Sequence, residues 1–414
     1  MPTPKDASLL PAPKVILRLA VPSPLRRLFD YLAPVDLDDE QIAALTPGMR
    51  VRVPFGSRAL VAVLVSLETH TEVPLARLRP ALEVLDNQAL LPQSLTNLYL
   101  WAAQYYQHPP GDVFHSMLPA LLRQGRPAER PGKKVWQLSE AGQELTEQDL
   151  RRAPRQREIV EFLKEHEALD KSAVSEMGIS ASALIALQAN GFIVMEERAA
   201  SSPRAFDAQH STAQALALNS EQTHAVEQIG KGLGSFQCHL LDGVTGSGKT
   251  EVYLQIIARV LEQSRQALVL VPEISLTPQT IARFRQRFAC QIAVLHSGLT
   301  DSERLNAWLE ARDGVAKIII GTRSALFTPM AQPGVIIIDE EHDSSFKQQE
   351  GFRYSARDLA IVRARQEKVS IVLGSATPSL ESLHNALSGR YSHLTLKERA
   401  GDAASPTLKL LDTT

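Results

Sequence analysis

The segment that most constrains this chain of 414 residues is Gly243-Val-Thr-Gly-Ser-Gly-Lys-Thr250. An apolar segment at 236–241 precedes it, and a segment with helical spacing follows at 249–263. Glycines between a strand and a helix let backbone amides wrap a phosphate group, and the N-terminus of the helix favours bound anions. The segment therefore predicts a phosphate-binding loop, and with it an α/β domain.

The residues of this loop have distinct expected roles. Lys249 should reach the β- and γ-phosphates of ATP, and Thr250 should offer its hydroxyl to Mg²⁺. The loop residues expected to bind ATP are Gly243, Thr245, Gly246, Ser247, Gly248, Lys249 and Thr250. The alternative is a chance glycine-rich turn, which the flanking strand and helix argue against.

The region from about residue 215 alternates between apolar and helical segments. In chain order the expected strands and helices lie at 236–241, 249–263, 267–271, 278–288, 292–295, 301–312, 317–320, 335–338, 356–367 and 370–373. Several of the expected strands are almost wholly apolar, as strands covered on both faces are. The alternation predicts a parallel, doubly wound sheet.

Consecutive acidic residues end one of these strands, in Ile336-Ile-Ile-Asp-Glu-Glu-His342. We expect Asp339 to bind Mg²⁺ and Glu340 to polarise the attacking water. Solvated turn residues are the alternative, and the phosphate-binding loop in the same domain argues against it. Two interpretations of His342 remain open, a relay between the ATP site and a nucleic acid or a cap on a loop.

Composition narrows the class of protein. The net charge is −2, so no overall basic excess points to nucleic acid, and any such surface must be local. The two cysteines, Cys238 and Cys290, exclude a disulfide framework and a four-cysteine zinc site within this sequence, and they suit a reducing cytosol. The N-terminus lacks a signal-peptide pattern, and the apolar run Leu60–Leu67 is too short to span a bilayer. We therefore expect a cytoplasmic protein without a membrane segment.

The first part of the chain has strand patterns. Two runs, 15–21 and 60–67, are mostly apolar and rich in strand formers. Polar and apolar side chains alternate in 48–56, which has turn residues at both ends. These patterns predict a small barrel or sandwich. Apolar residues at three- and four-residue spacing predict a helix at 93–107. We expect this β-rich domain to span residues 13–115.

A polar, basic segment follows, and we interpret residues 116–134 as a linker. The patterns after it predict helices at 154–166, 170–177 and 180–190 and a strand at 191–196. Short helices followed by a terminal strand favour a winged-helix domain over residues 135–200. Its first helix region carries the cations Arg151, Arg152, Arg155 and Arg157. Duplex binding and a merely solvated helix start both remain open for these arginines.

Further segments resemble the motifs of helicase superfamily 2. Val271–Gln279 matches motif Ia, Gly321–Phe327 matches motif Ib, and Gly374–Pro378 matches motif III, all in the order and spacing of that superfamily. Leu218–Gln222 resembles the segment that reads adenine in related helicases. A glutamine amide can bond both N6 and N7 of adenine, which explains the residue type.

This resemblance implies a RecA-like helicase lobe of the DExH type over residues 210–400. It places Gln222 on the adenine of ATP and Arg323 on DNA. It also implies that three residues couple ATP hydrolysis to DNA, namely His342, Ser375 and Thr377.

A narrower resemblance is to the PriA family of replication-restart DNA helicases. The segments that carry it are Gly298–Arg304, Thr322–Pro329 and Asp339–Tyr354. The last segment interleaves aromatic and cationic residues, which suits stacking and backbone contact on single-stranded DNA. Its expected DNA-binding residues are Phe346, Lys347, Phe352, Arg353 and Tyr354. Ordinary packing of Phe346 under a surface loop is the alternative.

The same family resemblance reaches the N-terminal domain. Leu28–Tyr31 and Val53–Gly56 look like the part of the family that binds the 3′ end of a nascent strand. The pocket residues implied by the match are Phe29, Asp30, Tyr31, Gly56 and Arg79. Asp30 would accept a bond from a terminal 3′-hydroxyl and repel a continuing phosphate. Aromatic core packing remains the alternative for Phe29.

Membership of this family would imply an ATP-dependent 3′–5′ DNA helicase that recognises stalled forks and restarts replication by primosome assembly. Forked and single-stranded DNA, single-stranded-DNA-binding protein and primosome proteins would be its partners, with ATP and Mg²⁺ as cofactors. The family also has two zinc-binding cysteine quartets and a second motor lobe, and we expect residues 401–414 to begin that region. Two alternatives are another superfamily 2 translocase, acting on RNA or chromatin, and a DNA-end-binding module without enzymatic activity.

Overall fold

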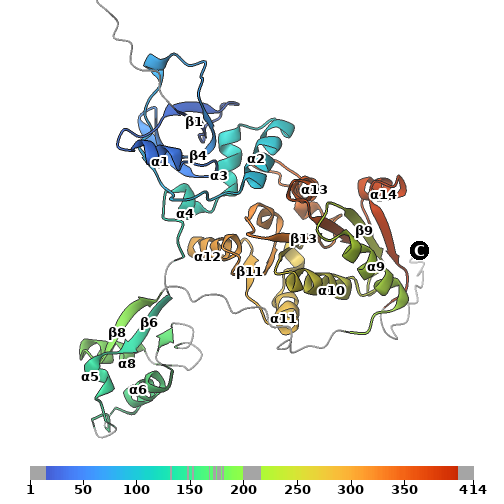
Figure 1. The fold of residues 1–414 in the computed structure, drawn as a ribbon. Coiled ribbons are helices and arrows are strands. Elements are labelled where there is room, and N and C mark those ends of the chain that lie inside the picture. Colours follow the sequence, from blue (N-terminus) through green and yellow to red (C-terminus); the bar gives the residue numbers. More distant parts are fainter. Residues whose placement is uncertain are drawn as a thin grey trace, which may run out of the picture. The chain divides into compact units, whose positions relative to one another are not determined.

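The computed structural model describes residues 15–399, apart from residues 131–132, 147–148, 152, 167, 171–173, 175–178, 180 and 199–215. The described residues belong to two compact units. The larger unit joins the described residues up to Ala128 to those from Leu216 onward, and the smaller unit lies within Glu129–Ser202 (Figure 1).

The N-terminal part of the larger unit is a five-stranded sheet with the order β2-β1-β4-β3-β5. Its strands pair antiparallel. The elements are β1 (Ile16–Ala20), β2 (Phe29–Leu32), α1 (Asp39–Ala43), β3 (Arg50–Phe55), β4 (Arg58–Glu68) and β5 (Glu83–Val84). The strands predicted at 15–21, 48–56 and 60–67 are confirmed, whereas β2 and β5 are too short for a periodic signal.

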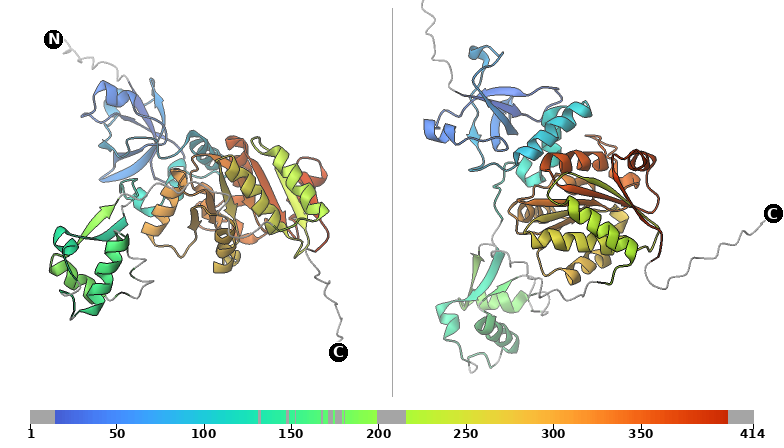
Figure 2. Two further views of the ribbon diagram at one scale, coloured as in Figure 1. Left: turned by 60° about the horizontal axis from the view of Figure 1, so that its bottom comes forward. Right: turned by 45° about the vertical axis from the view of Figure 1, so that its right-hand side comes forward.

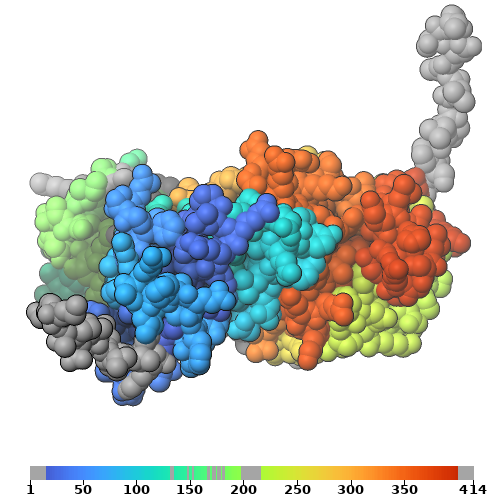
Figure 3. All heavy atoms as spheres, turned by 90° about the horizontal axis from the view of Figure 1, so that it is seen from above, coloured from blue at the N-terminus to red at the C-terminus, as the bar shows by residue number. Residues whose placement is uncertain are grey.

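Three helices follow this sheet: α2 (Gln93–Tyr105), α3 (Pro110–Met117) and α4 (Ala120–Arg123). They share a core with the rest of the larger unit, and their cyan atoms adjoin its orange atoms in Figure 3. The buried hydroxyl of Tyr99 on α2, for example, donates to the carbonyl of Phe327 at 3.0 Å. Leu118 and Leu122 are buried there as well, so the predicted linker 116–134 is wrong over its first residues. Apolar side chains among the polar ones hold that segment in the core.

The remaining part of the larger unit is a seven-stranded parallel sheet with the order β11-β12-β10-β13-β14-β9-β15. Its strands are β9 (Cys238–Gly243), β10 (Gln266–Leu270), β11 (Ile292–Leu295), β12 (Ile318–Gly321), β13 (Pro333–Ile338), β14 (Ser370–Ser375) and β15 (Ser392–Leu396). Its helices are α9 (Ser220–Gly232), α10 (Lys249–Glu262), α11 (Pro278–Arg287), α12 (Asp301–Arg312), α13 (Ala356–Glu367) and α14 (Leu380–Leu387).

Helices cover both faces of this sheet (Figure 2). Helices α9, α10 and α11 share a core with one face, which includes Val269 of β10. Helices α12 and α13 share a core with the other, which includes the next residue, Leu270. Alternate strand residues thus enter opposite cores, which explains why the strands are apolar throughout. The predicted doubly wound sheet is confirmed.

The smaller unit has a three-stranded antiparallel sheet with the order β7-β6-β8. Its elements are β6 (Lys133–Leu138), α5 (Glu140–Gln143), α6 (Pro154–His166), β7 (Leu169–Asp170), α8 (Ala181–Ala189) and β8 (Ile193–Arg198). Most of the helix predicted at 170–177 lies outside the described residues, and Asp170 ends a strand. The winged-helix assignment stays a prediction. Among the arginines, Arg157 lies 3.5 Å from Glu161, and Arg152 is outside the described residues.

No described helix is long and apolar enough to cross a membrane.

Candidate nucleotide and DNA-end sites

The carboxyl ends of β9, β13 and β14 bring the candidate nucleotide-binding residues together. These three strands are neighbours in the parallel sheet, in the order β13-β14-β9. The phosphate-binding loop follows β9, the acidic residues follow β13, and the segment resembling motif III follows β14. Ligands of open α/β sheets bind outside the carboxyl ends of the strands.

The phosphate-binding loop runs from Gly243, where β9 ends, to Lys249, where α10 begins. Gly246 and Gly248 both have a φ of 82°, a left-handed conformation that side chains rarely adopt. A Cβ atom on Gly243 would lie 2.6 Å from the Ser247 hydroxyl, so a larger residue would crowd the loop. The glycines in the sequence motif therefore have conformational and steric causes.

Two buried polar groups of this loop fit the phosphates of ATP. The ammonium of Lys249 donates to the carbonyl of Gly243 at 2.7 Å, inside the loop. The hydroxyl of Ser247 is buried and has no hydrogen-bond partner among the described residues. A buried cation and an unpaired hydroxyl in a loop of this shape suit a bound anion. Thr250, expected to offer its hydroxyl to Mg²⁺, lies half-buried in the first turn of α10.

Gln222 lies against the same loop, with both ends of its side-chain amide in use. Its oxygen accepts from the backbone of Asn219 at 3.0 Å, and its nitrogen donates to the carbonyl of Ser247 at 2.8 Å. Gln222 thus completes a capping box at the start of α9 and ties that helix to the loop. Each of these two atoms keeps a second hydrogen-bonding position, and the predicted contact with adenine stays a prediction.

Asp339 follows β13 and is held by a residue that the sequence analysis missed. The hydroxyl of Tyr253 donates to Oδ1 of Asp339 at 3.0 Å. Burial raises the pKa of Asp339, and the hydrogen bond from Tyr253 opposes that rise. Tyr253 comes four residues after Lys249, a spacing that places both on one face of α10. That spacing was the available signal.

Glu340, the candidate base, has a left-handed backbone with a φ of 47°. Non-glycine residues held in this region are uncommon and gather at functional sites. Its carboxylate is about a third exposed and lies 3.7 Å from Nδ1 of His342. The side chain is therefore open to solvent beside the nucleotide loop, as a base for water requires.

The three predicted coupling residues meet at one point. The Nδ1 atom of His342 lies 2.8 Å from the hydroxyl of Ser375, and that hydroxyl accepts from the backbone of Thr377 at 3.0 Å. The hydroxyl of Thr377 lies 3.4 Å from Nε2 of the same histidine. His342 therefore connects the acidic segment to the segment after β14, and its role in coupling stays a prediction.

Glu341 is a second residue that the sequence analysis missed. Its carboxylate is buried and accepts from the backbone of Ser379 at 2.7 Å, from the hydroxyl of Ser382 at 2.9 Å and from Arg357 at 3.0 Å. These partners start α14 and α13. Glu341 therefore fixes the acidic segment to both helices.

The aromatic residues expected to stack on DNA are packed inside the larger unit. Phe346, Phe352 and Tyr354 are 2%, 5% and 9% exposed. Phe352 stacks on Tyr354 at 5.0 Å between ring centroids, and Tyr354 packs edge-on against Phe327 at 5.1 Å. For Phe346 the structure shows the alternative, packing under a surface segment. Stacking on DNA would require this segment to rearrange.

The cations of this region differ in their availability. Arg323 donates to the carbonyls of Ser345 at 2.9 Å and of Lys347 at 3.0 Å, so it holds the aromatic segment in place. Lys347 and Arg353 have exposed side chains. Of the predicted DNA contacts in this segment, those two are accessible as the structure stands.

A cavity of about 930 Å³ in the N-terminal domain contains most of the predicted DNA-end residues, namely Phe29, Asp30, Tyr31 and Arg79. Three further arginines line it, Arg18, Arg27 and Arg77. The Arg27 guanidinium lies 5.0 Å above the Phe29 ring, and Phe29 packs edge-on against Phe55 at 5.3 Å. Gly56 lies in the turn between β3 and β4, next to Phe55. Gly56 is not among the lining residues, whereas the other four predicted residues share one cavity that is slightly basic, with four arginines against Asp30, Glu68 and Glu72.

Within this cavity Asp30 is paired. Arg18 donates to both of its carboxylate oxygens, at 2.9 and 3.2 Å, and Thr71 donates to one of them at 2.6 Å. Burial favours a higher pKa for Asp30, but these hydrogen bonds lower the pKa below its usual value. Its repulsion of a phosphate is weaker than the sequence suggests, because Arg18 balances the charge. Tyr31 is buried and donates to the carbonyl of Pro54 at 3.0 Å, so its hydroxyl serves the fold.

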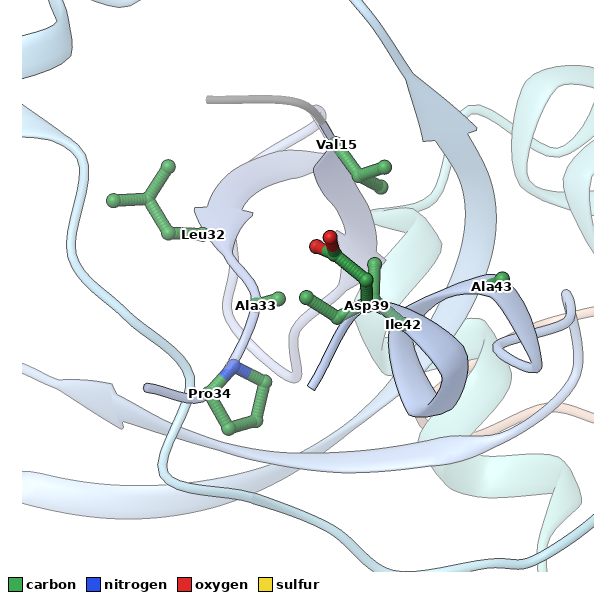
Figure 4. Close-up of a pocket in the computed structure, with 7 residues that line it drawn as sticks. All are labelled: Val15, Leu32, Ala33, Pro34, Asp39, Ile42 and Ala43. Atoms are coloured by element: carbon green, nitrogen blue, oxygen red, sulfur yellow. The ribbon is translucent and has the colours of Figure 1, made fainter. Parts of the chain in front are cut away.

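A second hollow of about 530 Å³ lies beside α1 (Figure 4). Its lining is mainly apolar, and no predicted site residue belongs to it: Val15, Leu32, Ala33, Pro34, Asp39, Ile42 and Ala43. Among the described residues there is also no cluster of three or more His, Cys, Asp and Glu side chains that would hold a metal ion.

Comparisons with known proteins decide between the families that share such a lobe. The family model of the PriA "3′DNA-binding domain (3′BD)" matches residues 18–119, and that of the "DEAD/DEAH box helicase" matches residues 219–386. Replication restart protein PriA of Haemophilus influenzae is 44% identical over 401 residues, which is 94% of this chain. The chain belongs to the PriA family.

Other relatives agree. Replication restart protein PriA of Chlamydia pneumoniae is 34% identical over 96% of this chain, and that of Bacillus subtilis is 49% identical over 48% of it. The chain spans about half the length of the relatives that match it throughout, 53% for both Haemophilus influenzae and Chlamydia pneumoniae, whereas the Bacillus subtilis match covers 25% of that protein. Among solved structures, RecG bound to a three-way DNA junction matches 50% of this chain and 27% of its own, at 21% identity and a TM-score of 0.38.

Proposed function

We propose that the protein binds Mg-ATP at the phosphate-binding loop and uses its hydrolysis to move 3′ to 5′ along DNA and unwind it. The observation that carries this proposal is the convergence of Lys249, Asp339 and Glu340 after the carboxyl ends of β9 and β13, which flank β14, next to the His342–Ser375 pair. The family's members, named replication restart proteins, support DNA as the track.

Each residue has a task that its position supports. Lys249 would leave the Gly243 carbonyl and bind the phosphates, while Thr250 and Asp339 would hold Mg²⁺. When bound, Mg²⁺ neutralises charge that develops on the phosphates. Glu340 would accept the proton of the attacking water, because its carboxylate is exposed beside the loop.

The basic cavity around Phe29 and Asp30 would bind the 3′ end of a DNA strand at a fork. Support comes from the match to the 3′DNA-binding domain and from the arginines that line the cavity. We further propose that the intact protein restarts replication at abandoned forks with single-stranded-DNA-binding protein and primosome proteins, in the cytoplasm. We also propose, from the family resemblance, that the intact protein binds two zinc ions through ligands that are not in this sequence.

A second candidate function is fork binding without hydrolysis. The basic cavity favours it for this chain taken alone, because a DNA end can bind there without ATP hydrolysis. Superfamily 2 motors hold ATP between two lobes, and the second lobe supplies an arginine to the site. Such an arginine raises the rate by about 10³–10⁵ in related phosphoryl-transfer systems.

Steady-state ATPase assays with forked DNA, on this chain and on one extended to the relatives' length, separate the two functions. We expect stimulated hydrolysis, abolished by Lys249→Ala, from the extended chain and almost none from the shorter one. An extended chain that binds forks without any hydrolysis would support the second function.

A further inference from the structure

Tyr253 is a polar residue buried beside the nucleotide site that the proposed mechanism does not use. It is 2% exposed and lies on α10, one turn after Lys249. Its hydroxyl donates to Oδ1 of Asp339 at 3.0 Å. A buried phenol with a single carboxylate acceptor is costly to leave unpaired, so the contact fixes both side chains.

The strand between β9 and β13 is shaped to admit this phenol. Gly374 lies in β14, which pairs with β13 on one side and β9 on the other. A Cβ atom on Gly374 would overlap the Tyr253 hydroxyl. The glycine of the motif III segment therefore leaves the space through which Tyr253 reaches Asp339, and three separate segments build one contact.

We propose that Tyr253 is a positioning residue for the Mg²⁺-binding carboxylate of Asp339. The phenol holds Oδ1, which leaves Oδ2 to face the cation or one of its waters. Removing a residue that hydrogen-bonds to a metal ligand typically changes the metal affinity by about 10–100-fold. This inference rests on the proposed Mg-ATP site and adds the group that orients its carboxylate.

Titration of Mg²⁺ into the whole chain with the fluorescent nucleotide mant-ATP tests the proposal. Tyr253→Phe keeps the ring and removes only the hydroxyl. We expect the Mg²⁺ midpoint, the Mg²⁺ concentration at the half-maximal change in mant fluorescence, to rise about tenfold. Binding of mant-ATP in EDTA should stay within about twofold of the wild type, because the phosphate contacts of Lys249 do not involve Tyr253.

The matched control is Tyr99→Phe. It also removes a buried phenol hydrogen bond, from Tyr99 on α2 to the carbonyl of Phe327 at 3.0 Å, in which none of the proposed nucleotide-binding residues takes part. Its Mg²⁺ midpoint should equal that of the wild type. Gly374→Ala offers a second route, since its Cβ would displace the phenol and should raise the Mg²⁺ midpoint as Tyr253→Phe does.

The outcomes separate this inference from the function beneath it. A Tyr253→Phe chain with the same Mg²⁺ midpoint as the Tyr99→Phe chain would overturn the positioning role and leave the nucleotide site standing. A wild-type chain whose mant-ATP binding ignores Mg²⁺ would overturn the Mg-ATP site itself, and this inference with it.

Discussion

The guanidinium of Arg357 and the carboxylate of Glu341 lie 3.0 Å apart in an ion pair whose side chains are 13% and 0% exposed. Arg357 is in the first turn of α13, directly after the aromatic segment that ends at Tyr354. Glu341 directly follows the candidate base Glu340. The pair thus links the residue after Glu340 to the helix that follows the aromatic segment.

Replacing Glu341 should destabilise the protein strongly. Glu341→Ala leaves Arg357 and the hydrogen-bond donors of Ser379 and Ser382 without their buried acceptor. Breaking a buried ion pair from one side typically costs about 3–5 kcal/mol. Urea unfolding measures the loss, with Glu350→Ala as an exposed control. Equal stability of the two variants would show that the Glu341 network is not needed for folding.

The helicase lobe is predictable from sequence because its signals are local. The glycines between β9 and α10 are required by the conformation of their own backbone, and the strands are recognisable from their consecutive apolar residues. Tyr253 and Glu341 could not be assigned that way, because their partners Asp339 and Arg357 belong to other segments brought close only by the sheet.

The N-terminal domain shows the same limit. The motif around Phe29 and Asp30 leads to the right cavity, but Arg18, which pairs with Asp30, is on the neighbouring strand β1. Burial of Phe346 is likewise a tertiary property, because interleaved cations suggest an exposed segment. Pattern alone does not reveal which aromatic side chains a fold will cover.

Acid should weaken the fold through His239. It is buried in β9, and neither ring nitrogen has a hydrogen-bond partner among the described residues. Burial lowers the pKa of His239 to about 4 from its ordinary value near 6.5. The unfolded chain therefore binds the extra proton first as pH falls. The stability contributed by the neutral ring is complete above about pH 6.5 and lost progressively towards pH 4.

The variant His239→Leu should remove that part of the pH dependence. Between about pH 6 and 4.5 its free energy of unfolding should fall less steeply than that of the wild type, by up to about 1.4 kcal/mol per pH unit. Urea unfolding at several pH values gives both slopes. Parallel slopes would mean that His239 is protonated equally in the folded and unfolded chains.

The choice of DNA end should depend on Asp30. Asp30→Ala removes a carboxylate and leaves Arg18 and Arg79 facing the cavity. The affinity for forks with a 3′-phosphate should therefore rise relative to the affinity for forks with a 3′-hydroxyl. We expect the ratio of the two dissociation constants to move about fivefold or more. The whole chain is the material to use, because α2 packs into the core of the helicase lobe.

Glu72→Ala is the control for this experiment, since it removes an exposed carboxylate that lines the same cavity. It should change the ratio far less, because Asp30 is fixed in the cavity by hydrogen bonds from both Arg18 and Thr71. An equal change in both variants would show that net charge alone explains the effect and that Asp30 has no specific role in recognising the end.

Binding of mant-ATP and of forked DNA to the wild-type chain and to Lys249→Ala tests the central claim most directly, that the phosphate-binding loop is the nucleotide site of a DNA-binding protein. Lys249 is buried in the loop, on a different sheet from the basic cavity. The variant should lose nucleotide affinity by about tenfold or more, while its fork affinity stays within about twofold. Undiminished nucleotide binding by a folded Lys249→Ala chain would contradict the account.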